Sequence, residues 1–373
     1  SILGMIGAKL VNTYENDSTG FVYSEMKIIH KLITLTTIGS NQVYRDVKAA
    51  LQLGYNRCHY SELCDGFQNI IKNITDRQNK DTVLYDNFFY SQIGWNNTGN
   101  SNNCSEDIKI DFKADATTVL SNINRGYGHY CRSSKYLEQN LDPRTDFYIL
   151  GVLKVAPSVF GPVTLFDTGV NFHDLEGKRR NVTWVKSTGD IWIVSYRNDT
   201  VSDCGSVKLY RSVISNGTLY MLYFRPSLTD EERNIDKTKC IQQIFVNLKE
   251  YINMTINMTG TKNHKPYNSS ALFVPPMNIS TDINLKPFLQ DKMRKTFEKD
   301  QISHLYDTED TLYELRTWDY FTNTPENINI TENHQHSGGD IYLYSPFVFA
   351  VLDKETEILL KTGAFLRPKT DRI

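Results

Sequence analysis

The C-terminal segment constrains the fold of this chain more than any other part of its sequence. Two apolar runs, Ile341–Val351 and Ile358–Pro368, flank the charged residues Asp353–Glu357. Short apolar runs around a polar turn are typical of paired β-strands, and Gly363 and Pro368 are of the residue types that bend or end strands. The sequence therefore predicts a C-terminal hairpin that is buried on both faces.

Composition indicates an ordinary globular protein. The chain has 373 residues, of which 40% are hydrophobic and 23% charged, with a net charge of −2. This balance gives no electrostatic reason to expect nucleic acid or an anionic membrane as a partner. The basic run Lys178–Arg180 follows Leu175–Gly177 and is interpreted as a solvated turn. No apolar run has the length of a membrane span. Without an initiator Met or signal peptide, we expect a processed chain.

Glycosylation sequons indicate a secreted protein with a sugar-coated surface. Twelve Asn-x-Ser/Thr sequons occur, where chance would supply about five. Their asparagines are Asn16, Asn73, Asn96, Asn103, Asn181, Asn198, Asn216, Asn253, Asn257, Asn268, Asn278 and Asn329.

The cysteines indicate disulfides formed in an oxidising compartment, because their number is even and their spacing fits neither a zinc site nor a redox motif. Six cysteines allow fifteen pairings. The simplest scheme is sequential and joins Cys58 to Cys64, Cys104 to Cys131, and Cys204 to Cys240.

Hydrophobic periodicity predicts an α+β architecture that opens with helices and continues into mixed strands. Helices are predicted at 2–14, 25–35 (capped by Ser24), 42–51, 61–75, 112–137, 238–252 and 285–293. Strands are predicted at 82–90, 145–155, 182–185, 191–196, 207–210 and 219–224, besides the C-terminal hairpin. Since no linker or internal repeat divides the sequence, we expect a single domain over residues 1–373.

The C-terminal segment also resembles the signature of the serpin family, in which a Pro-Phe pair opens a central strand and a Gly…Pro pair ends the last one. Tyr344 departs from that signature, because the family prefers Asp, Asn or Gln there. Further resemblances follow in the family's order, at Phe21–Ile28, Phe112–Ala116, Ile123–Asn124, Leu141–Pro143, Phe166–Thr168 and Phe172. The resemblance implies the serpin fold. That fold has a large central, mostly antiparallel sheet A, smaller sheets B and C that form a β-barrel-like half, and about eight or nine helices.

Serpin inhibitors insert a cleaved reactive loop into their main sheet, which requires a hinge of Gly, a hydroxyl residue and several Ala. Counting back from Pro346, the hinge begins near Glu326, and Ile328 stands where Gly is expected. The segment lacks Ala, is several residues short, and carries a sequon at Asn329 whose glycan could not be buried. The reactive-loop equivalent consists of Glu326, Asn327, Ile328, Asn329, Ile330, Thr331, Glu332, Asn333, His334, Gln335, His336, Ser337, Gly338, Gly339 and Asp340.

The family also holds a hydrogen-bonded shutter of two Ser, one Asn and one His beneath its sheet. The positions that match are Ser24, Lys27, Val152 and Trp318, so only Ser24 retains the family's residue. Together with the altered loop, this departure predicts that protease inhibition has been lost.

No catalytic or cofactor-binding constellation emerges, and we predict no enzyme. His334 and His336, with Asp340 beyond, would share a face of a strand and could hold a metal. A polar loop explains them as well, and we predict no metal site. Ser24 and Ser337 have no His and Asp at a recognised spacing for nucleophilic catalysis.

The resemblance implies a secreted protein that acts by binding a host extracellular or cell-surface protein. Degenerate secreted serpins resemble virus-encoded immune modulators, including gammaherpesvirus serpin homologues that act on host immune cells, with T-cell stimulation as one such action. The alternatives are an active serpin inhibitor of serine or cysteine proteases, and a carrier of a hormone or another small molecule in an apolar pocket.

Overall fold

The computed structural model divides the chain into two compact units. The described residues are 2–16, 18–53, 60–78, 82–92, 104, 106–115, 117–119, 121, 147–187, 191–197, 204–227, 236–257, 271–298, 301, 315–325, 328, 331–335 and 338–369. The first unit comprises Ser1–Glu25, Val155–Thr281 and Tyr320–Ile373, and the second comprises Met26–Lys154 and Asp282–Asp319. The expectation of a single domain over the whole chain stays a prediction.

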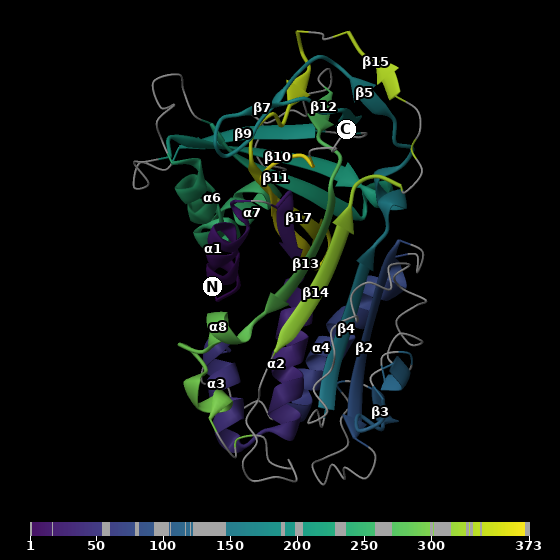
Figure 1. Cartoon of the computed structure of the whole chain (residues 1–373), viewed down its shortest axis with the longest axis vertical. Coiled ribbons are helices and arrows are strands. Elements are labelled where there is room, and N and C mark those ends of the chain that lie inside the picture. The colour runs from purple at the N-terminus through teal and green to yellow at the C-terminus, as the bar shows by residue number, and fades with distance from the viewer. Residues whose placement is uncertain are drawn as a thin grey trace. The chain divides into compact units, whose positions relative to one another are not determined.

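A six-stranded antiparallel sheet forms the core of the first unit (Figure 1). Its strands, in spatial order, are β1 (Gly20–Tyr23), β18 (Leu359–Phe365), β17 (Phe347–Asp353), β11 (Leu219–Ser227), β10 (Ser206–Ile214) and β9 (Ile191–Arg197). The predicted C-terminal hairpin is confirmed as β17 and β18, and every residue of β17 is buried. A Cβ on Gly363 would overlap the carbonyl of Phe21 on β1, so only glycine allows these strands to approach.

Helices α1 (Ile2–Tyr14), α6 (Lys237–Val246) and α7 (Leu248–Asn257) also belong to the first unit. The residues predicted to be helical at 238–252 are helical except for Asn247, whose backbone angles (φ −100°, ψ 11°) are not helical and separate α6 from α7. Helix α1 packs closely on α6, where a Cβ on Gly7 would collide with the Phe245 ring. This contact leaves no space for a larger residue on that face of α1.

A five-stranded sheet completes the first unit. In spatial order it contains β15 (Thr331–Asn333), β5 (Leu165–Asp167), β8 (Trp184–Lys186), β12 (Leu272–Val274) and β16 (Ile341–Tyr342). The fully buried Trp184 packs edge-on against Tyr342, at 5.1 Å between ring centroids. Beside these strands, β6 (Phe172–His173) and β7 (Arg179–Arg180) form a small antiparallel hairpin, and 3-10 turns cover Pro157–Phe160 and Ser215–Gly217.

The second unit combines helices with two small groups of strands (Figure 1). Its helices are α2 (Glu25–Ile38), α3 (Asn41–Ala50), α4 (Tyr60–Arg77) and α8 (Lys286–Leu289), with a 3-10 turn at Arg294–Phe297. Its strands are β2 (Val83–Gln92), β3 (Glu106–Ile110) and β4 (Phe147–Val155), in the order β3-β2-β4, and parts of β13 (Asn278–Asn284) and β14 (Arg316–Thr322), which pair with each other.

The predicted helix over 112–137 starts later than the sequence suggested. Residues 112–115 form a turn, and the Asp115 carboxylate accepts the Thr118 N–H at 3.0 Å, as a helix N-cap does. Most of the remaining predicted helix lies outside the described residues.

The disulfides correct the sequential pairing scheme. Cys204 pairs with Cys240, in agreement with that scheme. Cys64 pairs with Cys104, so the pairings of Cys58 with Cys64 and of Cys104 with Cys131 are wrong. The physical reason is tertiary: α4 places Cys64 with its Cα 5.0 Å from that of Cys104, a usual separation for a disulfide. Cys58 and Cys131 lie outside the described residues.

Candidate functional site

The reactive-loop equivalent contributes a strand to the five-stranded sheet. Thr331–Asn333 form β15, which pairs in parallel with Leu165–Asp167 of β5, and the His334 N–H continues the ladder to the Asp167 carbonyl at 3.0 Å. Figure 1 shows β15 beside β5. Main-chain groups of the loop are therefore committed to hydrogen bonds within the protein. Glu326, Asn327, Asn329, Ile330, His336 and Ser337 lie outside the described residues.

His334 connects the β15 end of this loop to Asp340 near its other end. Its Nε2 lies 2.9 Å from the Asp340 carboxylate, and its ring packs against Phe273 and Phe166 at centroid distances of 4.9 and 5.6 Å. The ring thus contacts both an acidic group and two aromatic rings. Within the described part of the chain, no group of three or more potential ligands is placed to hold a metal ion.

The two shutter equivalents that lie on strands, Val152 and Trp318, pack in one apolar cluster. Val152 of β4 belongs to this cluster, and Trp318 of β14 packs against it. Because successive strand residues alternate between faces, their neighbours face α2 instead. A Cβ on Gly151 would lie 3.5 Å from the Lys27 side chain, and the Asp319 carboxylate lies 3.3 Å from Lys27 Nζ. The residues that meet Lys27 are therefore Gly151 and Asp319, each one position from the predicted Val152 and Trp318.

A buried salt bridge joins Lys27 of α2 to Asp319 of β14. Lys27 and Asp319 are 2% and 1% exposed. Lys27 Nζ also donates a hydrogen bond to the Trp318 carbonyl, so one ammonium group contacts both a side chain and the backbone of β14. Ser24, which the sequence predicts to match a shutter residue, is fully buried in the first unit.

Lys31, one helical turn after Lys27, reaches the other strand. Its Nζ donates a hydrogen bond to the Ile149 carbonyl of β4. Burial, followed by repulsion from Lys27, lowers the pKa of Lys31 to about 7. Helix α2 thus contacts the backbone of β14 through Lys27 and that of β4 through Lys31.

His30 completes this buried cluster, which we define as Lys27, His30, Lys31 and Asp319. Its Nδ1 lies 2.6 Å from the Tyr85 hydroxyl and its Nε2 lies 2.7 Å from the Cys104 carbonyl, so Nε2 carries the proton. Burial lowers the pKa of His30 to about 4, which keeps the ring neutral at physiological pH.

Sequence reasoning missed His30, Lys31 and Asp319. The available signal was the spacing of Lys27, His30 and Lys31, which places three basic side chains on one face of α2. All three are buried, although the rest of the buried face is largely apolar. A basic stripe of this kind indicates a buried acidic or carbonyl partner.

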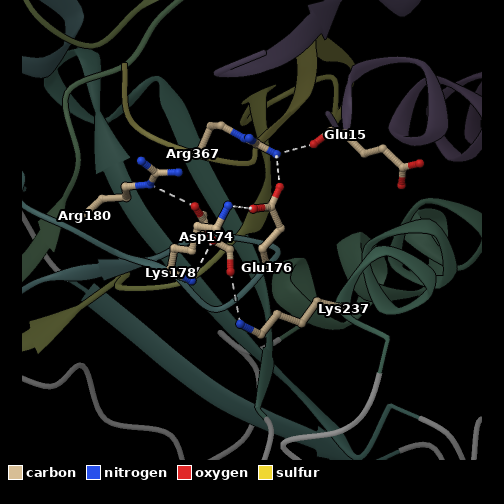
Figure 2. Close-up of polar contacts among 7 residues, drawn as sticks. All are labelled: Glu15, Asp174, Glu176, Lys178, Arg180, Lys237 and Arg367. Carbon is tan, nitrogen blue, oxygen red and sulfur yellow. Dashed lines mark hydrogen bonds and ion pairs between the residues drawn. The ribbon is translucent and has the colours of Figure 1, made fainter. Parts of the chain in front are cut away.

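An ion network centred on Asp174 lies at the β6–β7 hairpin in the first unit (Figure 2). The fully buried Asp174 carboxylate accepts hydrogen bonds from Arg180 Nε at 2.9 Å and from the Lys178 N–H at 2.8 Å. Lys237 donates to the Asp174 carbonyl at 3.0 Å, and Glu176 pairs with Lys178. The run interpreted as a solvated turn is therefore partly structural.

Comparison with known proteins identifies the fold. No protein-family profile matches the chain, and no curated protein is significantly similar to it in sequence. Thyroxine-binding globulin in complex with thyroxine matches with a TM-score of 0.70 and 14% identity, over 99% of this chain and 100% of that one. Mouse protein-Z dependent protease inhibitor gives 0.70 and 13%, over 98% and 96%. The thermophilic serpin tengpin in its native state gives 0.68 and 14%, over 98% and 93%.

These similarities show that the chain has the serpin fold, which confirms the fold expected from the C-terminal signature. The similar proteins differ in what they do, since one binds thyroxine and another inhibits a protease. At identities this low the likeness concerns fold alone, and function must be argued from the chain's own residues.

Proposed function

We propose that this chain is a secreted, glycosylated serpin-fold protein that has lost protease inhibition and acts by binding a protein partner. The pairing of Thr331–Asn333 with β5 carries the proposal. A loop that inserts into another sheet must first give up these hydrogen bonds and the contacts of His334 with Asp340, Phe166 and Phe273. The loop's sequence also lacks the small-residue hinge that would let it slide between two strands.

The buried cluster supports the same proposal. Among the described strands, β4 is an edge strand and β14 pairs only with β13. A strand entering beside β4 and β14 would need backbone groups of both, yet the carbonyls of Ile149 on β4 and Trp318 on β14 accept hydrogen bonds from lysines of α2. Disrupting one partner of a buried ion pair costs about 3–5 kcal/mol. Insertion would therefore start against a substantial barrier.

Surface chemistry supports secretion. Seven of the twelve sequon asparagines lie among the described residues, and all seven are exposed; they are Asn16, Asn73, Asn181, Asn216, Asn253, Asn257 and Asn278. Exposure is necessary for a mature protein to carry these glycans, and the two disulfides fit an oxidising compartment. Across the described residues, no helix combines the length and apolarity required to traverse a membrane.

The partner we propose is a host extracellular or cell-surface protein, and the role that of a virus-encoded modulator of immune cells, such as T cells. This step rests on the resemblance of secreted serpins with degenerate loops to such modulators. The proposal includes no enzymatic activity. The alternative of a small-molecule carrier would need an apolar pocket. The contact between α1 and α6 provides no such space, because Gly4 and Gly7 lie directly against Phe245.

A protease panel tests the loss of inhibition. The secreted, glycosylated chain is incubated with serine and cysteine proteases and then analysed by denaturing gel, with a known serpin inhibitor as the positive control. We expect cleaved or intact chain but no covalent complex that survives denaturation, together with full residual protease activity. A stable complex with any protease in the panel, accompanied by its inactivation, would overturn the proposal.

A further inference from the structure

Tyr344, the position where the C-terminal signature departs from its family, is an exposed aromatic residue. Its side chain is 45% exposed, whereas most large apolar side chains among the described residues are buried. The proposed loss of inhibition gives this residue no role. Tyrosine is among the residue types that most often dominate binding energy at protein interfaces.

The Tyr344 ring stacks on a buried arginine side chain. The guanidinium of Arg225, a residue that is only 5% exposed, lies over this ring at 4.4 Å from the centroid. Arg225 is itself fixed by donating from Nη2 to the Tyr210 hydroxyl at 3.2 Å. Cation–π stacking on a buried, anchored arginine restricts the ring, so a partner would meet an ordered side chain.

A second contact connects Tyr344 to the β6–β7 hairpin. The His173 N–H donates to the Tyr344 carbonyl at 2.7 Å, and the two rings pack edge-on at 6.2 Å between centroids. Directly opposite His173 in the hairpin is Arg179, which is exposed. Burial lowers the pKa of His173, and the charges of Lys237 and Arg179 lower it further, whereas the charge of Asp174 raises it.

The charges around Tyr344 are predominantly positive. The anions described next to the hairpin are already occupied, because Asp174 binds Arg180 and Glu176 binds Lys178. Figure 2 shows these pairs, together with the Lys237 ammonium at the Asp174 carbonyl. The exposed guanidinium of Arg179 has neither carboxylate as a hydrogen-bonded partner in this network.

We infer that Tyr344, His173, Arg179 and Lys237 form a docking surface for an acidic segment of a partner protein, with the buried Arg225 holding the Tyr344 ring in place. An ordered aromatic ring supplies the apolar anchor, and the cations beside it complement carboxylates that flank the anchored residue. The central aromatic favours a protein over a sulfated glycan, since glycan recognition rests mainly on cations. The inference rests on the proposed binding function and specifies the chemistry of its partner.

A peptide-binding experiment with the full secreted chain tests this surface. The probe is a fluorescent twelve-residue peptide of glutamates around a central Leu-Phe pair, and its matched control replaces every glutamate by glutamine. We expect the acidic peptide to bind in physiological salt and the glutamine peptide to bind at least about tenfold more weakly. Tyr344→Ala should weaken acidic-peptide binding about tenfold, while Tyr344→Phe should retain most of it.

Arg179→Glu provides a second variant at an exposed position, where folding is not at risk. It should weaken binding at least about fivefold and make it less salt-dependent, whereas Lys72→Glu on the exposed face of α4 should leave it unchanged. The inference would be overturned if both peptides bound equally or if neither bound measurably. It would also be overturned if heparin displaced the acidic peptide and the Tyr344→Ala variant bound that peptide as tightly as the unchanged chain. None of these results bears on the protease panel, so failure of this surface and failure of the non-inhibitory proposal are distinguishable.

Discussion

Replacement of Lys27 by methionine is expected to lower the free energy of unfolding by about 3–5 kcal/mol, the usual cost of removing one partner of a buried ion pair. Methionine fills a similar volume, so the loss reports charge and hydrogen bonding instead of a cavity. Asp319, which is 1% exposed, would keep its carboxylate without the ammonium 3.3 Å away. The Trp318 carbonyl would lose its donor as well.

Urea unfolding followed by circular dichroism measures this change. The matched control is Lys72→Met, an exposed lysine on α4, for which we expect a change within about 0.5 kcal/mol. The double variant Lys27→Met with Asp319→Leu removes both charges and should recover most of the lost stability. If Lys27→Met cost no more than the Lys72 control, the buried salt bridge would not hold β14 to α2.

Removal of the disulfide between Cys64 and Cys104 by paired serine substitutions is expected to cost about 4 kcal/mol on the chain-entropy estimate. The two cysteines are separated by 40 residues. The disulfide also fixes a carbonyl on which the interior depends. The Cys104 carbonyl accepts hydrogen bonds from His30 Nε2 and Gln68 Nε2, each at 2.7 Å. Loosening Cys104 would weaken the buried cluster as well as the chain closure.

The second disulfide provides the control for this prediction. Cys204 and Cys240 are separated by 36 residues, so the closure entropy is nearly the same, yet both belong to the first unit, whereas the buried cluster belongs to the second. We expect paired serines at Cys204 and Cys240 to lower the free energy of unfolding by about the chain-entropy amount alone. Paired serines at Cys64 and Cys104 should lower it by more, because the contacts of His30 also loosen. Free thiols at both Cys64 and Cys104, found by mass spectrometry of the secreted chain, would contradict the pairing itself.

The sequence predicted the helices and strands whose residues show a regular local pattern of apolar and polar side chains. Residues 2–14 and 61–75 show helical periodicity and form α1 and α4, and the C-terminal apolar runs form β17 and β18. Such segments bury one face against any neighbour, so the pattern alone is sufficient. The sequence did not predict the break at Asn247, because its helical periodicity continues on both sides of this residue.

The candidate site was less predictable because it depends on contacts between distant parts of the chain. Thr331–Asn333 is short and polar, and only its pairing with β5 makes it a strand. Asp319 contacts Lys27 because strand alternation turns its side chain toward α2. The resemblance to the family predicted the neighbouring Trp318 at this position instead. The partner of Cys64 was likewise fixed by where α4 packs. Long-range pairing of this kind leaves little trace in local sequence.

The most direct test of the account is the melting temperature of the secreted chain before and after limited proteolysis within residues 327–345. Because the loop is paired with β5 and the buried cluster holds β4 and β14, we predict that cleavage changes the melting temperature by less than about 2 °C, equivalent to roughly 1 kcal/mol or less. A rise on the order of 10 °C after cleavage would show that the loop inserts, and would contradict the loss of inhibition.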